Sequence, residues 1–201
     1  MEKIKVLILL LLLFSAEISV AQKYGAAPFV QKGLMNMSTG LTGGIMTFNQ
    51  VQDIYFNLSF AYCVEHQIGV RTDLEVFLPD YNFEGQLQKN SCLLVGPEFH
   101  FPFGRFDLSL IFEPGVAFTY LKDGAADKKT QTEPVFTMSL GFYYYLFRNF
   151  HVFTSAGYLH GNYFLENTDP FRLDEIRITG GLGINIFVNH QEAFERKRVK
   201  F

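Results

Sequence analysis

Charged side chains recur at every second position in several stretches of this chain, and this spacing is the first indication of a functional site. Arg71, Asp73 and Glu75 form one such series, and Glu175 and Arg177 form another. Residues two apart lie on the same face of a β-strand, so each series would share one surface. Enclosed charges must pair or stay hydrated, which predicts either an ion-pair plug or a narrow solute or proton path. The full set of charged residues and histidines on the polar face of the predicted strands is Arg71, Asp73, Glu75, Glu98, His100, Asp107, Glu113, Glu175 and Arg177.

Residue types that bind metals and cofactors are present, but their spacing is unsuitable. The five histidines are scattered, with no pair at ligand spacing. Residues 181–183, Gly-Leu-Gly, lack the strand-turn-helix context of a dinucleotide loop. We therefore expect no metal and no cofactor. Cys63 and Cys92 share the parity of the charges but fall at opposite strand ends, which predicts two free, buried thiols.

Large apolar residues alternate with small or polar ones along most of the chain, which predicts strands with two unlike faces. The segments with this pattern are 33–46, 53–62, 67–78, 91–103, 106–120, 134–147, 151–163 and 175–188. Short turns alternate with longer polar connections, which indicates an up-and-down meander of about eight strands. The turns are expected at 65–66, 104–105 and 148–149, and the long connections at 79–90, 121–133 and 162–174.

The volume of the apolar side chains decides which face points inward. A packed eight-stranded barrel holds only about twelve interior side chains in its layers, far fewer than the apolar faces supply. A soluble two-sheet sandwich would need a charged outer face, yet none of the ten lysines lies in a predicted strand. We therefore predict an all-β, eight-stranded antiparallel up-and-down transmembrane β-barrel with its apolar side facing lipid. A soluble periplasmic lipid-binding β protein is the less favoured alternative.

The beginning of the chain has the pattern of a secretory signal peptide. Lys3 and Lys5 precede the apolar block 6–14, and Ser-Val-Ala at 19–21 forms a small-x-small cleavage site. We predict a signal peptide over 1–21, a periplasmic N-terminal segment over 22–32, the barrel over 33–188 and a polar tail over 189–201. The formal net charge of -3 is not that of a nucleic-acid binder.

Contacts at particular positions can also be predicted. Placing the connection 79–90 as a symmetric hairpin sets Arg71 opposite Glu98, and Arg177 is expected to pair with an acid across the lumen. Pro97 and Pro114 interrupt neighbouring strands at about the same height, which predicts a shared β-bulge. Aromatic residues near the strand ends predict interfacial girdles, formed by Phe101, Phe103, Phe106, Tyr120, Phe136, Phe147 and Phe150.

The predicted architecture resembles the small eight-stranded outer-membrane proteins of Gram-negative bacteria, the OmpA-like and OmpX-like barrel domains. Residues 179–186 are similar to the polar-x-Gly-x-x-apolar-x-apolar pattern by which such proteins address their insertion machinery. The resemblance implies an integral outer-membrane protein, a monomer, in contact with outer-membrane lipid and inserted by the barrel assembly machinery. Its long loops would be extracellular and both termini periplasmic.

Function is then expected in the surface loops, as adhesion, ligand capture or envelope integrity, although the sequence names no surface ligand. The acidic lumen favours the alternative, a narrow solute or proton path. Residues 158–162 are superficially similar to the His-x-Ser-Asn stretch of lipid A deacylases, with His160 in the histidine position. Asn162 stands where that stretch has its nucleophilic serine, so the covalent route fails and no enzyme is predicted.

Overall fold

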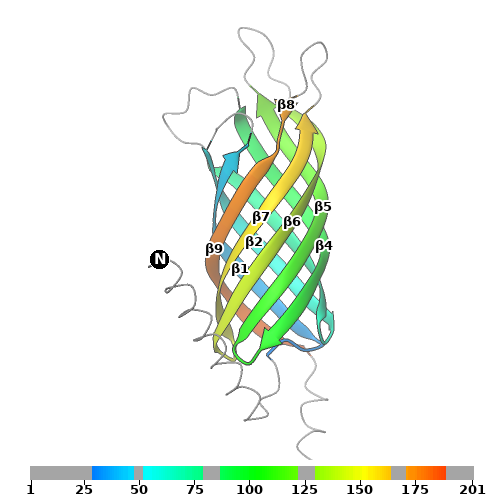
Figure 1. Cartoon of the computed structure of the whole chain (residues 1–201), viewed down its shortest axis with the longest axis vertical. Helices are drawn as coiled ribbons and strands as arrows, with labels where there is room; N and C mark the ends of the chain where they lie inside the picture. The colour runs from blue at the N-terminus through cyan, green and yellow to red at the C-terminus, as the bar shows by residue number, and fades with distance from the viewer. Residues whose placement is uncertain (1–28, 48–51, 79–86, 122–129, 164–170, 189–201) are drawn as a thin grey trace, which may run out of the picture.

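The computed structural model describes residues 29–47, 52–78, 87–121, 130–163 and 171–188. Eight long antiparallel strands wind around a closed barrel, with the short turns at one end (Figure 1). The strands are β1 (Leu34–Met46), β2 (Gln52–Glu65), β3 (Ile68–Leu78), β4 (Leu87–Phe103), β5 (Phe106–Leu121), β6 (Thr130–Phe147), β7 (Phe150–Tyr163), the two-residue β8 (Phe171–Arg172) and β9 (Glu175–Phe187). Among the described residues, no helix is long and apolar enough to cross a membrane.

The sheet closes because β9 pairs with both β7 and β1. Each strand from β1 to β7 pairs with the next one along the chain. The short β8 continues the same ladder on β7, since Asn162 pairs with Arg172 in the register that joins Leu159 to Glu175. The predicted eight-stranded antiparallel up-and-down barrel is therefore confirmed, and its last strand is interrupted by two residues.

The stagger of the pairing explains the tilt of the strands and the narrow interior. A path that starts at Asn36 and follows the paired residues once around the barrel returns to β1 at Met46, ten residues further on. The offset of ten residues, at about 3.3 Å per residue, is measured along the strands, and eight strands about 4.8 Å apart make up the circumference. The ratio of the two lengths corresponds to a strand tilt of about 40° from the barrel axis. A barrel of this size is just wide enough to be filled by side chains. The path passes through Asn36, Ala61, Arg71, Gly96, Glu113, Thr137, Leu159, Glu175 and Met46.

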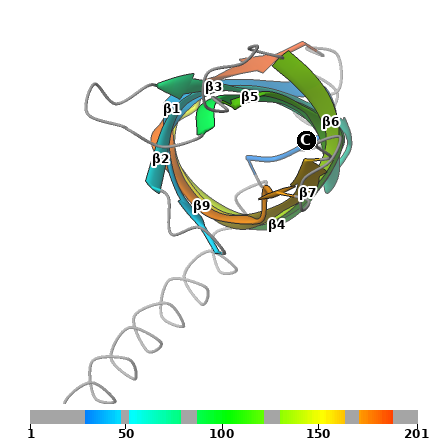
Figure 2. The same ribbon diagram turned by 90° about the horizontal axis from the view of Figure 1, so that it is seen from above.

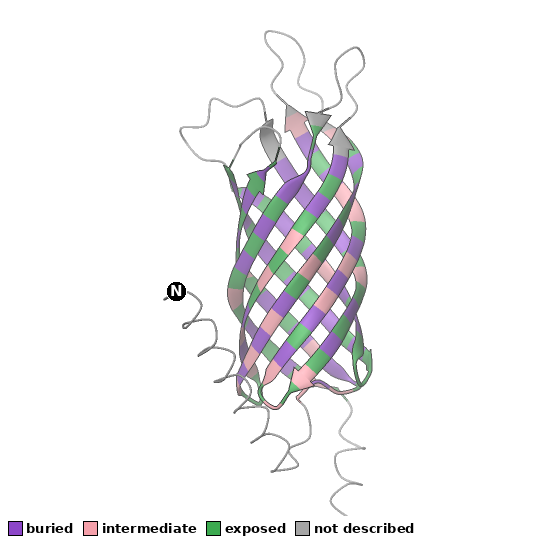
Figure 3. Ribbon diagram, viewed as in Figure 1, coloured by how far each residue is buried: buried purple, intermediate pink, exposed green. Residues whose placement is uncertain are grey.

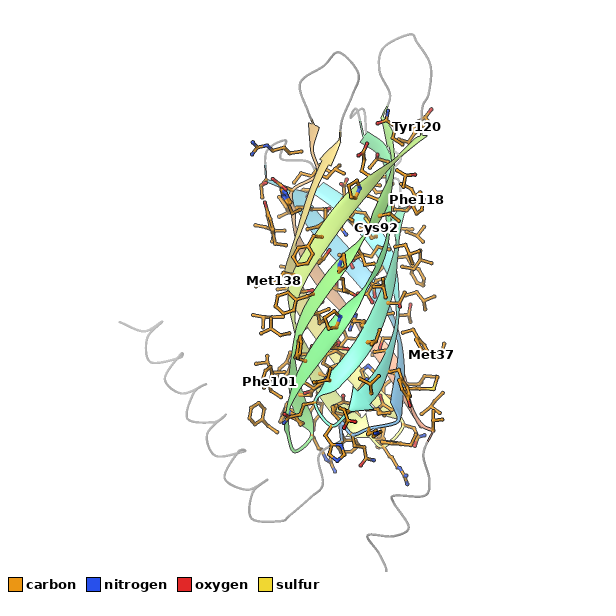
Figure 4. The ribbon with its side chains drawn as sticks, turned by 90° about the vertical axis from the view of Figure 1, so that its right-hand side faces the viewer. Met37, Cys92, Phe101, Phe118, Tyr120 and Met138 are labelled. Carbon is orange, nitrogen blue, oxygen red and sulfur yellow. The ribbon has the colours of Figure 1, made fainter. Side chains whose placement is uncertain are left out.

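The two faces of the sheet differ as the alternation predicts. Along β2 exposed and buried residues alternate from Gln52 to Cys63, and the same banding runs around the barrel (Figure 3). Phe56 and Leu58 are each 43% exposed, whereas Asn57 between them is 1% exposed. Met138 and Met37 point away from the barrel (Figure 4). Apolar side chains therefore cover the outside, and polar side chains fill the interior.

Two strands begin well before the residues that the alternation predicted. β4 starts at Leu87 and β6 at Thr130, each four residues before the predicted start. Lys89 consequently lies within a strand, and the expectation that no lysine does so is wrong. Lys89 pairs with Tyr120 of β5, so the backbone ladder continues beyond the region of apolar alternation. The first short turn is likewise formed by residues 66–67, one position later than predicted.

The prediction of a shared bulge at the two prolines is wrong. The pairs on either side, Leu94 with Gly115 and Glu98 with Ile111, keep one register, so neither strand carries an extra residue. The ladder is instead interrupted for three residues on each strand, because proline cannot donate a backbone hydrogen bond. A Cβ on Gly96 would lie 1.8 Å from a backbone oxygen of β5, so only glycine allows this close approach.

The predicted segments outside the barrel are described only in part. The signal peptide (1–21), the tail (189–201) and residues 22–28 lie outside the described residues. Residues 29–32, which we had assigned to a periplasmic segment, lie across the short-turn end of the barrel (Figure 2). Phe29 stacks on Tyr145 with ring centroids 5.0 Å apart, and Val30 is completely buried. This part of the segment therefore belongs to the packed interior.

Candidate functional site

All nine polar residues predicted to face the lumen are buried within the barrel. Their side chains come from β3, β4, β5 and β9, at the alternate positions that point inward. None is more than 7% exposed: Arg71, Asp73, Glu75, Glu98, His100, Asp107, Glu113, Glu175 and Arg177.

Arg71 is the centre of one group of contacts near the short-turn half of the lumen. Its Nε donates to Oδ1 of Asp73 at 2.9 Å. Its terminal nitrogen lies 3.6 Å from Oε1 of Glu98, the partner expected from the sequence. The same nitrogen donates to the hydroxyl of Tyr143, which in turn donates to Glu98 at 2.8 Å. Arg71 is thereby held by two carboxylates and a tyrosine from three strands.

Arg177 is the centre of the second group, nearer the loop end. It donates to Glu75 of β3, across the lumen, and to Oε2 of Glu175 at 2.7 and 2.9 Å. Its guanidinium lies 4.5 Å from the ring centroid of Tyr55, a cation–π contact. The Tyr55 hydroxyl lies 3.0 Å from Glu175 and accepts from Asn90 at 3.1 Å. The acid across the lumen from Arg177 is therefore Glu75.

Two interior residues that the sequence analysis did not single out complete the network. His151 donates from Nδ1 to the Asn185 side-chain oxygen at 2.7 Å and accepts at Nε2 from Ser38 at 2.9 Å. Tyr143 links the Arg71 group to the His151 ring, whose centroid lies 5.6 Å away. The parity of β6 and β7 already placed these side chains inward. Only the pairing around the barrel could show what they contact.

An apolar cluster lies toward each end of the lumen. The loop-end cluster consists of Met46, Cys92, Leu94, Ala117, Val135, Leu159 and Leu173. The short-turn cluster consists of Val30, Leu34, Cys63, Tyr143, Tyr145 and Phe153, with Phe29 and Phe187 packed against it. Cys63 and Cys92 are both free and fully buried, as predicted, one in each cluster. The two apolar clusters and the charged side chains together occupy the interior.

The lumen holds more acidic than basic side chains. Among the nine predicted residues there are six carboxylates, two arginines and one histidine. Glu113 is 1% exposed, and its Oε1 has no hydrogen-bond partner among the described residues. An excess of acidic over basic side chains disfavours the entry of anions.

The predicted girdle residues lie on the outer face near the strand ends. Phe101 is found near the short turns, and Tyr120 near the loop end (Figure 4). Phe147 is 72% exposed, which is the largest value among the exposed apolar side chains of the described residues. Phe106 packs against Tyr144 with ring centroids 4.7 Å apart. Phe103 and Phe136 are exposed, and Phe150 is half-buried.

His160 lies outside the lumen, on the outer face near the loop end. Its side chain is 57% exposed, and its Nδ1 lies 2.6 Å from Oδ1 of Asp174. The paired carboxylate orients the ring. Asn162 remains at the position where a nucleophilic serine would be required, so this pair lacks the group that would attack an acyl bond.

Comparison with known proteins adds information on the fold. No protein-family model matches the chain, and no curated relative matches its sequence. Ail, the attachment invasion locus protein of Yersinia pestis, is similar in structure, with 14% identity, a TM-score of 0.54, and coverage of 78% of this chain and 100% of that chain. The fold is that of a small outer-membrane β-barrel.

Two further barrels support this assignment. Neisserial surface protein A has a TM-score of 0.56 at 12% identity, covering 78% of this chain and 97% of that chain. The N-terminal barrel domain of Pseudomonas aeruginosa OprF has a TM-score of 0.50 at 15% identity, covering 77% of this chain and 98% of that chain. The resemblance to eight-stranded outer-membrane barrels is therefore confirmed at the level of the fold.

Proposed function

We propose that this chain is an integral outer-membrane protein whose plugged barrel displays its long connections at the cell surface, where they act in adhesion, ligand capture or envelope integrity. The observation that carries the proposal is the filled interior, with an apolar cluster toward each end and ion pairs among its charged side chains. An interior of this kind offers no route for solutes. The long connections between the strands are then the part of the chain in which we expect binding.

The proposed orientation places the long connections outside the cell and both termini in the periplasm. It is supported by the difference between the two ends, because the short turns contain only two residues each. Outer-membrane barrels have short periplasmic turns and longer extracellular loops. The outward aromatic side chains at both ends would then lie at the two membrane interfaces, in contact with outer-membrane lipid.

The charge of the long connections bears on the class of surface ligand. One of the similar barrels, Ail, was solved in complex with the heparin analogue sucrose octasulfate. In this chain the segments 79–86, 122–129 and 164–170 together contain six acidic and three basic residues. An acidic surface repels polyanions, so we propose a neutral or cationic ligand in place of a sulfated one.

The experiment replaces the segments 79–86, 122–129 and 164–170 by short Asn-Gly turns in the otherwise intact chain. Cells carrying either form are compared for attachment to host cells and matrix proteins and for survival in detergent. Purified protein of both forms is tested for conductance in planar bilayers. We expect both forms to insert and neither to conduct, with attachment or detergent resistance lost only in the variant.

Two outcomes would contradict the proposal. If the variant inserts and retains every activity of the parent, the loops are not the functional part. If the parent shows discrete conductance steps, the lumen is a path and the ion pairs line it.

A further inference from the structure

Cys63, His100 and Asp107 form a chain of contacts inside the short-turn end. Sγ of Cys63 lies 3.9 Å from Nε2 of His100, and Nδ1 of the same ring lies 2.7 Å from Oδ2 of Asp107. A carboxylate only accepts, so Nδ1 donates to Asp107, and Nε2 is the ring nitrogen that faces the thiol. In this arrangement an imidazole and a nucleophile share a proton.

The pairing of three neighbouring strands brings these groups together. Cys63 of β2 pairs with Gly69 of β3, which pairs with Glu98 of β4. A Cβ on Gly69 would lie at van der Waals distance, 3.4 Å, from Nε2 of His100, so the imidazole lies directly beside this pair of Cys63 and Gly69. Oε2 of Glu98 lies 3.6 Å from the same nitrogen. An imidazolium formed here is therefore stabilised by carboxylates on both sides.

A buried hydroxyl in the same cluster has no partner among the described residues. Tyr145 is 1% exposed, and its hydroxyl has no hydrogen-bond partner among the described residues. This side chain belongs to the short-turn cluster with Cys63. A buried hydroxyl without a partner is costly, so a small polar group bound beside it would be favoured.

Residues 29–33 cover the thiol from the short-turn end. The backbone nitrogen of Gly33, which has a positive φ of 82°, donates to the carbonyl of Cys63 at 2.9 Å. Lys32 forms an exposed ion pair with Glu65 at 3.0 Å, and Phe29 stacks on Tyr145. Gly33 also accepts from the backbone nitrogen of Val188 at 3.0 Å, and Val30 is completely buried, so this segment must open locally before a disulfide can reach Cys63.

We propose that Cys63 is a thiol-exchange site that takes small disulfides entering from the short-turn end when residues 29–33 lift. Cys63 attacks one sulfur of the disulfide as a thiolate, with the shared proton on Nε2 of His100. The disulfide bond breaks, and its second sulfur leaves as a thiolate that takes the proton from His100. The products are a mixed disulfide on Cys63 and one free thiol. The proposal does not depend on the role of the loops.

Cys92 is a matched internal control. It is equally buried, but the contacts of its sulfur are with Arg177 at 3.8 Å and Asn90 at 3.9 Å, with no imidazole among them. Full-length protein with Cys92→Ala keeps only Cys63, and protein with Cys63→Ala keeps only Cys92. Both are folded in lipid and treated with dithiodipyridine, whose released thiopyridone is followed by absorbance. The folded state of each variant is verified by gel mobility without boiling.

We expect Cys63 to react about tenfold faster than Cys92 or more, because a positioned base contributes about 10²-fold or more and burial offsets part of that gain. His100→Gln should remove this advantage and leave the rate of Cys92 unchanged. Phe29→Ala should accelerate the reaction of Cys63 by the same factor with or without His100, because it changes only the opening of the cover. After boiling in SDS the two thiols should react equally.

The proposal is overturned if folded Cys63 reacts no faster than Cys92. It is also overturned if His100→Gln leaves the rate of Cys63 unchanged while Phe29→Ala raises it, since the thiol would then be accessible but not activated.

Discussion

Replacing Arg177 with methionine should destabilise the folded barrel by about 3–5 kcal/mol, because the removal of one partner leaves buried charges uncompensated. The side chain is 4% exposed and is held by Glu75 and Glu175 from opposite walls of the lumen. Its removal also leaves the Tyr55 ring without the cation that lies 4.5 Å from its centroid. The free energy of unfolding in urea, measured for protein folded in lipid vesicles, tests this.

Two companion variants separate the loss of charge from the loss of packing. Arg105→Met, in an exposed turn, should change the free energy of unfolding by less than about 0.5 kcal/mol. Adding Glu75→Gln and Glu175→Gln to Arg177→Met removes the unpaired charges and should restore most of the stability. If Arg177→Met alone has the stability of the parent, water hydrates these carboxylates, and the interior is not the packed plug described above.

Placing an arginine at Met138 should destabilise the barrel by about 2–4 kcal/mol in a lipid bilayer, the cost of a cation on the lipid face near the midplane. Met138 lies near the middle of β6, points outward and is 51% exposed (Figure 4). A side chain this exposed on a soluble protein would accept arginine with little effect. The free energy of unfolding, measured for protein in vesicles, therefore shows whether the outer face contacts lipid or water.

Met138→Leu is the matched control, because it keeps an apolar side chain of similar size at the same position. We expect it to unfold within about 0.5 kcal/mol of the parent. An arginine variant as stable as the leucine variant would contradict the assignment of lipid to this face.

The alternation of side chains predicted the strands well because both faces of each strand meet a uniform environment, lipid outside and a polar lumen inside. A symmetric hairpin at 79–90 predicted the contact between Arg71 and Glu98, although the observed register pairs Arg71 with Gly96, two residues from Glu98. The strand ends were harder to place. Lys89 belongs to β4 because its backbone pairs with Tyr120 of β5. The alternation of side chains does not predict where backbone pairing begins.

Contacts across the lumen could not be derived from sequence, because they depend on the stagger of the whole barrel. Arg177 reaches Glu75 across two intervening strands, and nothing in either local pattern selects that partner. The relation of Cys63 to His100 was missed for the same reason. The shared bulge was predicted wrongly because the prolines remove hydrogen bonds without adding a residue to either strand.

The most direct measurement is the gel mobility of the protein from the outer-membrane fraction, loaded in SDS with and without boiling. A closed barrel in which every strand is paired resists SDS at room temperature, so the unboiled protein should migrate at a different position and should remain in the membrane after carbonate extraction. A single band unaffected by boiling, from protein recovered in the soluble periplasmic fraction, would contradict the transmembrane barrel. The outer apolar face would then have to be buried by another part of the protein or by a partner.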